Sequence, residues 1–189
     1  SMHPRLANML IGGGDPMLAA IIEDGVKGRE TDIRYVQKSE RKHKLARRFQ
    51  REMGFSETRE SALGSEGAML ALAYPDRIAK NRGNGTFRMV NGRGAFLDGD
   101  DPLSKEPYLV CCELDDRVGD AKIFLAAKIS EREILDLFGD KITEKAECSW
   151  DRRTDSVKSL LKGQLGSMTV YEKPRQSAEG TEEALMQGV

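Results

Sequence analysis

In the first third of the chain, apolar residues recur at helical spacing between breaks rich in glycine and proline. The stretch Ile11–Pro16 is a loop that ends in an N-cap, and it predicts a buried helix over Met17–Ile22. Thr31–Met53 predicts a long helix or a broken pair of helices, and another helix is expected over Ala68–Tyr74. Pro75 ends or kinks this last helix. The amino-terminal part is therefore predicted to be helical.

From Asn81 onward, the pattern changes to short runs of alternating apolar residues between turn residues. Tyr108–Leu114 and Ala121–Ile129 have the clearest strand pattern, and a last hairpin is expected around Gly166. Shorter strands are expected over Thr86–Val90, Gly94–Leu97 and Ile142–Trp150. Ser130–Phe138 predicts a helix with a capping box at its start.

Helices come first in this order and strands follow, with one helix before the last strands. Segregation of this kind indicates an α+β fold. A short barrel with one internal helix is the sequence pattern of an OB-fold. We therefore predict a small helical-bundle domain followed by an OB-like β-barrel with one inserted helix.

The charges are separated along the sequence, although the 189 residues carry a net charge of only -1. Basic residues gather between Lys38 and Arg51 and again between Arg77 and Arg93, so they can build one basic face. The chain has no apolar run of the length that spans a membrane, and we expect no membrane partner.

The three cysteines, Cys111, Cys112 and Cys148, form neither a disulfide framework nor a metal-ligand spacing. We expect a reducing, cytoplasmic location and no metal site. A catalytic cysteine needs a base nearby, but Cys111 and Cys112 lie within a predicted strand, so packing is the favoured interpretation. There is no phosphate-binding loop for ATP. We expect no catalytic residue and no cofactor in this chain.

One stretch resembles a known family. Ala71–Ala79, followed by Arg82 and Asn91–Ala95, resembles the region after the motor domains of HrpB-type helicases, which are DEAH-box-like superfamily 2 enzymes. The resemblance covers nearly the whole chain and is weakest over Lys27–Leu63. At Ile22–Val26 the chain departs from a Ser-Glu-Arg-Asp-like element that is common in the family.

The resemblance implies that the chain is a piece of a longer ATP-dependent helicase. It implies a helical ratchet-like, helicase-associated domain at 3–80, an OB-like domain at 81–175, and a tail at 176–189 leading to a missing C-terminal extension. ATP and Mg would bind in the missing RecA-like motor domains, which would be partners of this region. The second partner would be a single strand of nucleic acid, with RNA favoured over DNA, in a channel that this region helps to close.

Such a channel needs cationic and polar side chains that track phosphates. The expected nucleic-acid-binding residues are Arg77, Lys80, Arg82, Arg88, Asn91 and Arg93. Arg77 has an equally weighted structural alternative, in which it pairs with Asp76 or braces the domain junction. Phe87 and Phe96 could stack on bases, but their alternation favours core packing.

Two other functions remain open from the sequence. The chain could be a protein-interaction module that docks a partner, or a stand-alone OB-type protein that binds single strands. The basic stretch Arg41–Arg51 could face the strand, the motors or only solvent, and it is left out of the predicted site. A salt series would separate strand binding from protein docking, because only strand binding weakens in proportion to the phosphates contacted.

Overall fold

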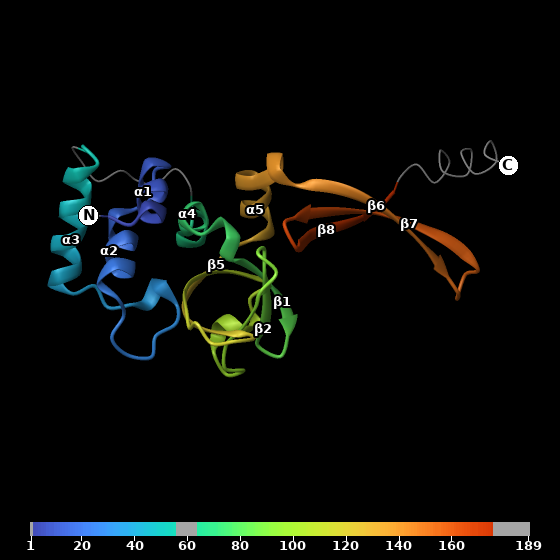
Figure 1. Cartoon of the computed structure of the whole chain (residues 1–189), viewed down its shortest axis with the longest axis horizontal. Helices are drawn as coiled ribbons and strands as arrows, with labels where there is room; N and C mark the ends of the chain where they lie inside the picture. Colours follow the sequence, from blue (N-terminus) through green and yellow to red (C-terminus); the bar gives the residue numbers. More distant parts are fainter. Residues whose placement is uncertain (1, 56–63, 176–189) are drawn as a thin grey trace.

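The computed structural model describes residues 2–55 and 64–175, so the predicted tail at 176–189 lies outside the described residues (Figure 1). The helices are α1 (Pro4–Ile11), α2 (Pro16–Asp24), α3 (Glu40–Glu52), α4 (Glu66–Ala73) and α5 (Glu131–Phe138). Short 3-10 turns are η1 (Ile33–Tyr35), η2 (Pro75–Arg77), η3 (Pro102–Lys105) and η4 (Gly139–Lys141). The strands are β1 (Ile78–Gly83), β2 (Thr86–Met89), β3 (Gly94–Phe96), β4 (Tyr108–Leu114), β5 (Ala121–Lys128), β6 (Thr143–Asp151), β7 (Ser156–Leu165) and β8 (Met168–Pro174).

Five of the strands form a closed barrel in the order β1-β2-β3-β5-β4. β4 closes the ring by pairing antiparallel with β1, where Val110 lies opposite Ile78. The turn between β1 and β2 takes positive φ at Asn84 (55°) and Gly85 (74°), which is the geometry of a tight hairpin. The fold is α+β with an OB-like barrel, as the sequence predicted.

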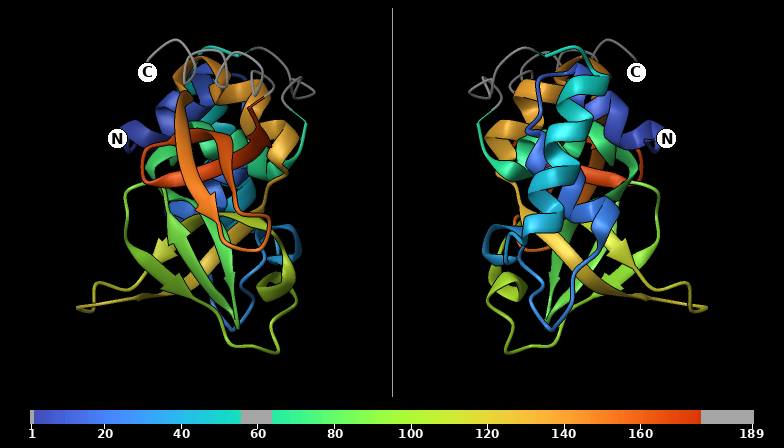
Figure 2. Two further views of the ribbon diagram at one scale, coloured as in Figure 1. Left: turned by 90° about the vertical axis from the view of Figure 1, so that its right-hand side faces the viewer. Right: turned by 90° about the vertical axis from the view of Figure 1, so that its left-hand side faces the viewer.

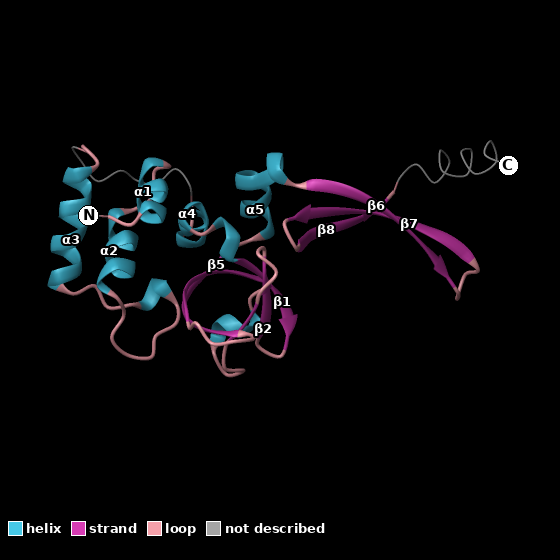
Figure 3. Ribbon diagram, in the orientation of Figure 1, coloured by secondary structure: helices cyan, strands magenta, loops and turns pink. Residues whose placement is uncertain are grey.

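Helices α1 to α4 gather at one end of the molecule and cover one side of the barrel, whereas α5 lies between them and the second sheet (Figures 1 and 3). α4 is apolar around most of its circumference and is buried, because α1, α5 and the barrel strands β4 and β5 surround it. Ser65 caps this helix by accepting a hydrogen bond from the Ala68 N–H, at 3.2 Å. Of the two alternatives for Thr31–Met53, the structure has the broken arrangement, since the 3-10 turn η1 precedes the helix α3.

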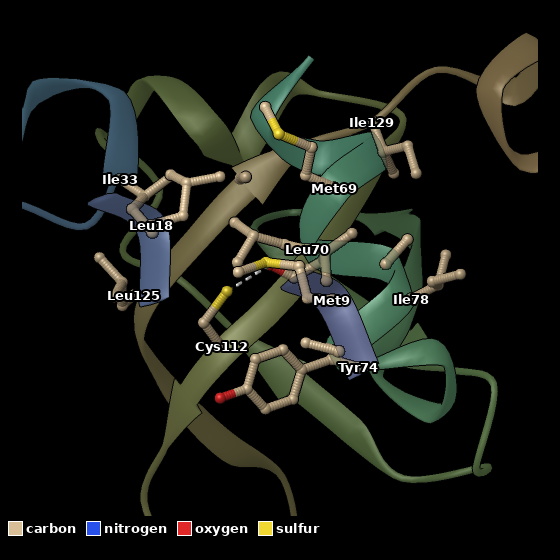
Figure 4. Close-up of a cluster of buried hydrophobic side chains, with 14 of the residues drawn as sticks. Met9, Leu18, Ile33, Met69, Leu70, Tyr74, Ile78, Cys112, Leu125 and Ile129 are labelled. Atoms are coloured by element: carbon tan, nitrogen blue, oxygen red, sulfur yellow. Dashed lines mark hydrogen bonds between the residues drawn. The ribbon is translucent and has the colours of Figure 1, made fainter. Parts of the chain in front are cut away.

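The buried side chains form two clusters. The barrel interior holds residues such as Phe87, Met89 and Ile123. A larger cluster joins the helices to the outer side of β4 and β5, where Cys112 and Leu125 meet side chains of α1, α2 and α4 (Figure 4). The helical part and the barrel therefore share one continuous core.

The last three strands form a separate sheet, β6-β7-β8, rather than further strands of the barrel. α5 lies between the last barrel strand and this sheet in the chain. The Tyr108 hydroxyl donates to the Val170 carbonyl at 2.9 Å, and Lys80 donates to the Thr169 carbonyl at 2.8 Å. These bonds attach β8 to the barrel. The β6–β7 hairpin projects away from the body in Figure 1 and is seen end-on in Figure 2.

Two local features go beyond what the sequence pattern indicated. The chain begins with the helix α1, in which Leu6, Met9 and Leu10 bury one face. After Pro75 the turn η2 ends at Arg77, because pairing with β2 and β4 places the following residues in β1. The barrel accordingly begins before residue 81.

Candidate nucleic-acid interface

The motif Tyr74–Arg77 joins three elements of the fold. The Arg5 guanidinium donates to both carboxylate oxygens of Asp76, at 2.6 and 3.1 Å. The hydrogen bond from Arg5 holds the pKa of Asp76 below its usual value, despite partial burial. Arg77 does not pair with Asp76; its guanidinium donates to the Cys112 carbonyl at 3.0 Å. The motif therefore ties α1 to η2 and η2 to β4.

Tyr74 is held between the two guanidiniums of this cluster. The guanidinium carbons of Arg5 and Arg77 lie 5.3 and 5.0 Å from the centre of the Tyr74 ring. Burial raises the pKa of Tyr74 to about 12, although both arginines oppose this shift. Arg77 thus braces the junction of the helices and the barrel, which was the structural alternative from the sequence.

The two strand cysteines are packing residues. Burial raises the pKa of Cys111 to about 12 and that of Cys112 well above its usual value. A thiol in this state is a poor nucleophile. Within residues 2–55 and 64–175, no three histidine, cysteine or acidic side chains are grouped as a metal site requires.

Three of the expected binding residues make hydrogen bonds within the fold. Lys80 binds β8 as described above. Arg93 donates to the carbonyls of Arg117 and Gly119, at 2.7 and 3.4 Å, and so fastens the β4–β5 turn to the β2–β3 turn. The Asn91 side-chain oxygen accepts from the Arg93 N–H at 2.9 Å, within the same turn. The polar groups of these three side chains therefore make hydrogen bonds within the protein.

Arg82, Arg88 and Asn91 are the exposed members of the predicted set, and Arg82 and Arg88 are the two cations among them. Both lie on the β1–β2 hairpin, and Arg88 is directly opposite Lys80 in the register. The part of the chain that the structure describes offers neither of these two guanidiniums a hydrogen bond or an ion pair. They remain available for phosphate groups.

An aromatic row continues this surface across β3 and β5. Phe87 is buried inside the barrel as predicted, whereas Phe96 lies outside that core and is half-buried, so the prediction for Phe96 is wrong. The Arg117 guanidinium lies 5.4 Å from the Phe96 ring centre. On β5, Lys122 is paired with Phe96 in the register, and its ammonium lies 5.9 Å from the ring centre of Phe124.

Phe124 is 47% exposed and borders a pocket of ≈ 530 Å³ between β5 and the Gly28–Thr31 loop. Phe124, Lys122 and Arg117 were not among the residues expected from the sequence. Alternation along β5, with Ile123 inside the barrel, was the available signal for the outward direction of Lys122 and Phe124. We define the outer barrel face as the surface formed by Arg82, Arg88, Phe96, Arg117, Lys122 and Phe124.

The basic surface of α3 is partly neutralised by neighbouring acids. Arg41 pairs with Asp24, and Arg47 and Arg48 pair with glutamates of their own helix. These pairs favour a solvated surface over a phosphate-binding one.

Comparison with known proteins supports the resemblance drawn from the sequence. No family model matches the chain. The ATP-dependent RNA helicase HrpB of Escherichia coli (strain K12) is 26% identical over 98% of this chain, which corresponds to 25% of that protein. A crystal structure of the E. coli DExH-box NTPase HrpB superposes with a TM-score of 0.80 and 24% identity, over 96% of this chain and 24% of that chain.

A second crystal structure, of the Escherichia coli DEAH/RHA helicase HrpB, gives a TM-score of 0.75 and 22% identity over 100% of this chain. This chain therefore spans about a quarter of the length of the proteins that it matches. Along its sequence the chain is similar to about one quarter of the E. coli helicase HrpB, and its fold is similar to the corresponding part of the HrpB crystal structures.

Proposed function

We propose that this chain is an accessory nucleic-acid-binding region of an ATP-dependent helicase. In this proposal the helices and the barrel help to close a channel over a single strand, and RecA-like motor domains of the same polypeptide bind ATP and Mg. RNA is favoured over DNA because the curated relative is named an RNA helicase. A cytoplasmic location is part of the same proposal. No helix among the described residues is long and apolar enough to cross a membrane.

The outer barrel face carries this proposal. It combines two exposed guanidiniums on the β1–β2 hairpin with partly exposed phenylalanine rings on β3 and β5 and with Arg117 in the β4–β5 loop. The β2–β3 face and the β4–β5 loop belong to the surface that OB-folds use to bind oligonucleotides. Cations neutralise phosphates, while aromatic rings accept bases of any sequence. Such a surface suits a strand of any base sequence that is threaded along it, rather than one particular base sequence.

The decisive experiment is an anisotropy titration of a labelled single-stranded RNA with three proteins. Besides the wild type, these are Arg82→Ala with Arg88→Ala, and Lys105→Ala with Lys141→Ala as a matched control. The control lysines are exposed and do not belong to the outer barrel face; they lie on η3 and η4. We expect the arginine pair alone to weaken binding, with a slope of log K against log salt shallower by about 1.4, or 0.7 per phosphate.

Equal loss in both double variants would show that the binding depends only on total charge. Unchanged affinity in the arginine double variant would remove Arg82 and Arg88 from the interface. Salt-independent binding of a protein partner by the wild type would favour the interaction-module alternative instead.

A further inference from the structure

Part of the second sheet stands apart from the barrel and the helices. β8 pairs with β7 as far as Leu160–Pro174, and the Arg175 N–H donates to the Ser159 carbonyl; beyond this bond, among the described residues, the outer ends of β6 and β7 pair only with each other. We call this two-stranded segment, Cys148–Ser159 with its turn, the ribbon. It projects away from the barrel and from the helices (Figure 1). Its side chains take no part in the two buried clusters.

The ribbon exposes a large aromatic ring near its tip. Trp150 is 59% exposed and lies directly opposite Val157, which is 48% exposed. Trp150 is also the single tryptophan in the 189 residues. An exposed tryptophan on a projecting hairpin contributes nothing to the core, so its position points to a contact outside the molecule.

The charges around Trp150 favour an anionic ligand. Lys158 pairs with Asp151 at 3.1 Å, which neutralises both. The remaining charges of the turn are Arg152 and Arg153 against Asp155, two positive and one negative, or +1. Both arginines are exposed, and neither has an ion-pair partner in the described part of the chain.

The size of the apolar surface decides between two classes of partner. A stable protein interface buries roughly 800 Å² on each side, whereas Trp150 and Val157 are the only large apolar side chains that the described part of this sheet exposes. Contact with a single strand needs only a ring for one base and cations for the flanking phosphates. We infer that the ribbon is a second single-strand contact, in which Trp150 stacks on an unpaired base and Arg152 and Arg153 bind phosphates.

This inference rests on the proposed function, but it can fail separately. Because Trp150 is the only tryptophan, its intrinsic fluorescence reports contact at the ribbon without any substitution. An oligouridine of roughly 16 nucleotides, near the upper site size of an OB-fold, is titrated into the protein. Trp150 fluorescence and the anisotropy of a label on the oligouridine are followed in the same titration.

We expect quenching of Trp150 that saturates together with the anisotropy. Trp150→Ala should weaken binding at least about fivefold, and Trp150→Phe should retain most of the affinity because a ring remains. Arg152→Ala with Arg153→Ala should reduce the salt dependence, whereas the pair Lys105→Ala and Lys141→Ala should not. Far-UV circular dichroism checks that the variants fold.

Binding without quenching, together with unchanged affinity of Trp150→Ala, would overturn the ribbon contact and leave the proposed function standing. If the wild type self-associates, and Trp150→Ala abolishes this but keeps its affinity for the oligouridine, the ribbon is a protein-binding surface. This result would also overturn the inference. Absence of any anisotropy change with the wild type would overturn the proposed function and the ribbon contact together.

Discussion

Asp76 and Arg77 are neighbours in the sequence, but they act on different parts of the fold. Asp76 accepts two hydrogen bonds from Arg5 of α1, while Arg77 donates to a carbonyl of β4. The ring of Tyr74 lies against the guanidiniums of Arg5 and Arg77. At the scale of single residues, the motif that carries the family resemblance is therefore a structural joint.

The ion pair of Asp76 should make stability depend on pH. Because its pKa is lowered in the folded state, the stabilisation is present above the ordinary carboxyl pKa of about 4 and is lost as the pH falls through the folded value. We expect Asp76→Asn to cost about 1 kcal/mol at pH 7, a value discounted because both partners are partly exposed. Urea unfolding of both proteins between pH 7 and 3 measures this. Their difference should shrink toward acid, and a constant difference would contradict the assignment.

Alanine substitutions at Arg77 and Arg82 should have different effects, one on the stability of the fold and the other on RNA affinity. Arg77→Ala leaves the Cys112 carbonyl without its guanidinium donor and should lower the free energy of unfolding by about 1–2 kcal/mol. Arg82→Ala, at an exposed position, should change it by less than about 0.5 kcal/mol. In RNA titrations below the melting temperature, we expect affinity to fall only for Arg82→Ala. The reverse pattern would place Arg77 in the interface.

At the scale of the elements, the packing of α4 against β5 leaves no space at one position. A Cβ added to Gly67 would lie 2.0 Å from the Lys128 carbonyl oxygen. Contact this close forces the helix away from the strand. Alanine would ordinarily stabilise a helix relative to glycine by about 1 kcal/mol, so the two effects oppose each other here.

We expect the clash to dominate, so that Gly67→Ala destabilises the protein by about 1–2 kcal/mol. Gly139, with φ -55° at the end of α5, has no atom near its added Cβ and provides the matched control. Chemical denaturation of both variants measures the effect. A stabilised Gly67→Ala variant would show that α4 can shift without loss.

Elements whose signals are local could be predicted from the sequence. The capping box at Ser130 and Glu133 is present, as are the clearest strands. Closure of the barrel depends on β4 pairing with β1, and the residues of these two strands contain no local pattern that predicts the pairing. The separate sheet was missed for the same reason, since alternation in β6 does not say which strands lie beside it.

The candidate site was predictable only in part. Arg82 and Arg88 lie exposed on the surface that was expected to bind a strand. Lys80 and Arg93 are held by backbone carbonyls of distant segments, which a sequence does not reveal. Phe96 ends a strand of three residues, too short for alternation to fix the direction of its side chain.

At the scale of the whole molecule, the shared core should make the described chain unfold as one unit. The cluster that contains Leu70 of α4 also contains Val110 of β4 and Val170 of β8. Division between residues 80 and 81 would moreover cut through β1. We expect neither 2–80 nor 81–175 to fold alone, as judged by thermal circular dichroism and amide hydrogen exchange. A cooperative transition in either half would show that it is an independent domain.

Because the barrel is closed, the second sheet is the part of the protein through which two molecules could pair strand to strand. A ring of strands has no free backbone edge, whereas in the described residues the sheet β6-β7-β8 has one along β6, since β8 is bonded to the barrel through its Thr169 and Val170 carbonyls. Eight of the nine residues of β6 are exposed, with Glu144, Lys145 and Glu147 among them. Charged side chains on a free edge discourage a second molecule from adding a strand. Neutralising these three positions should make concentrated solutions of the protein aggregate through that edge.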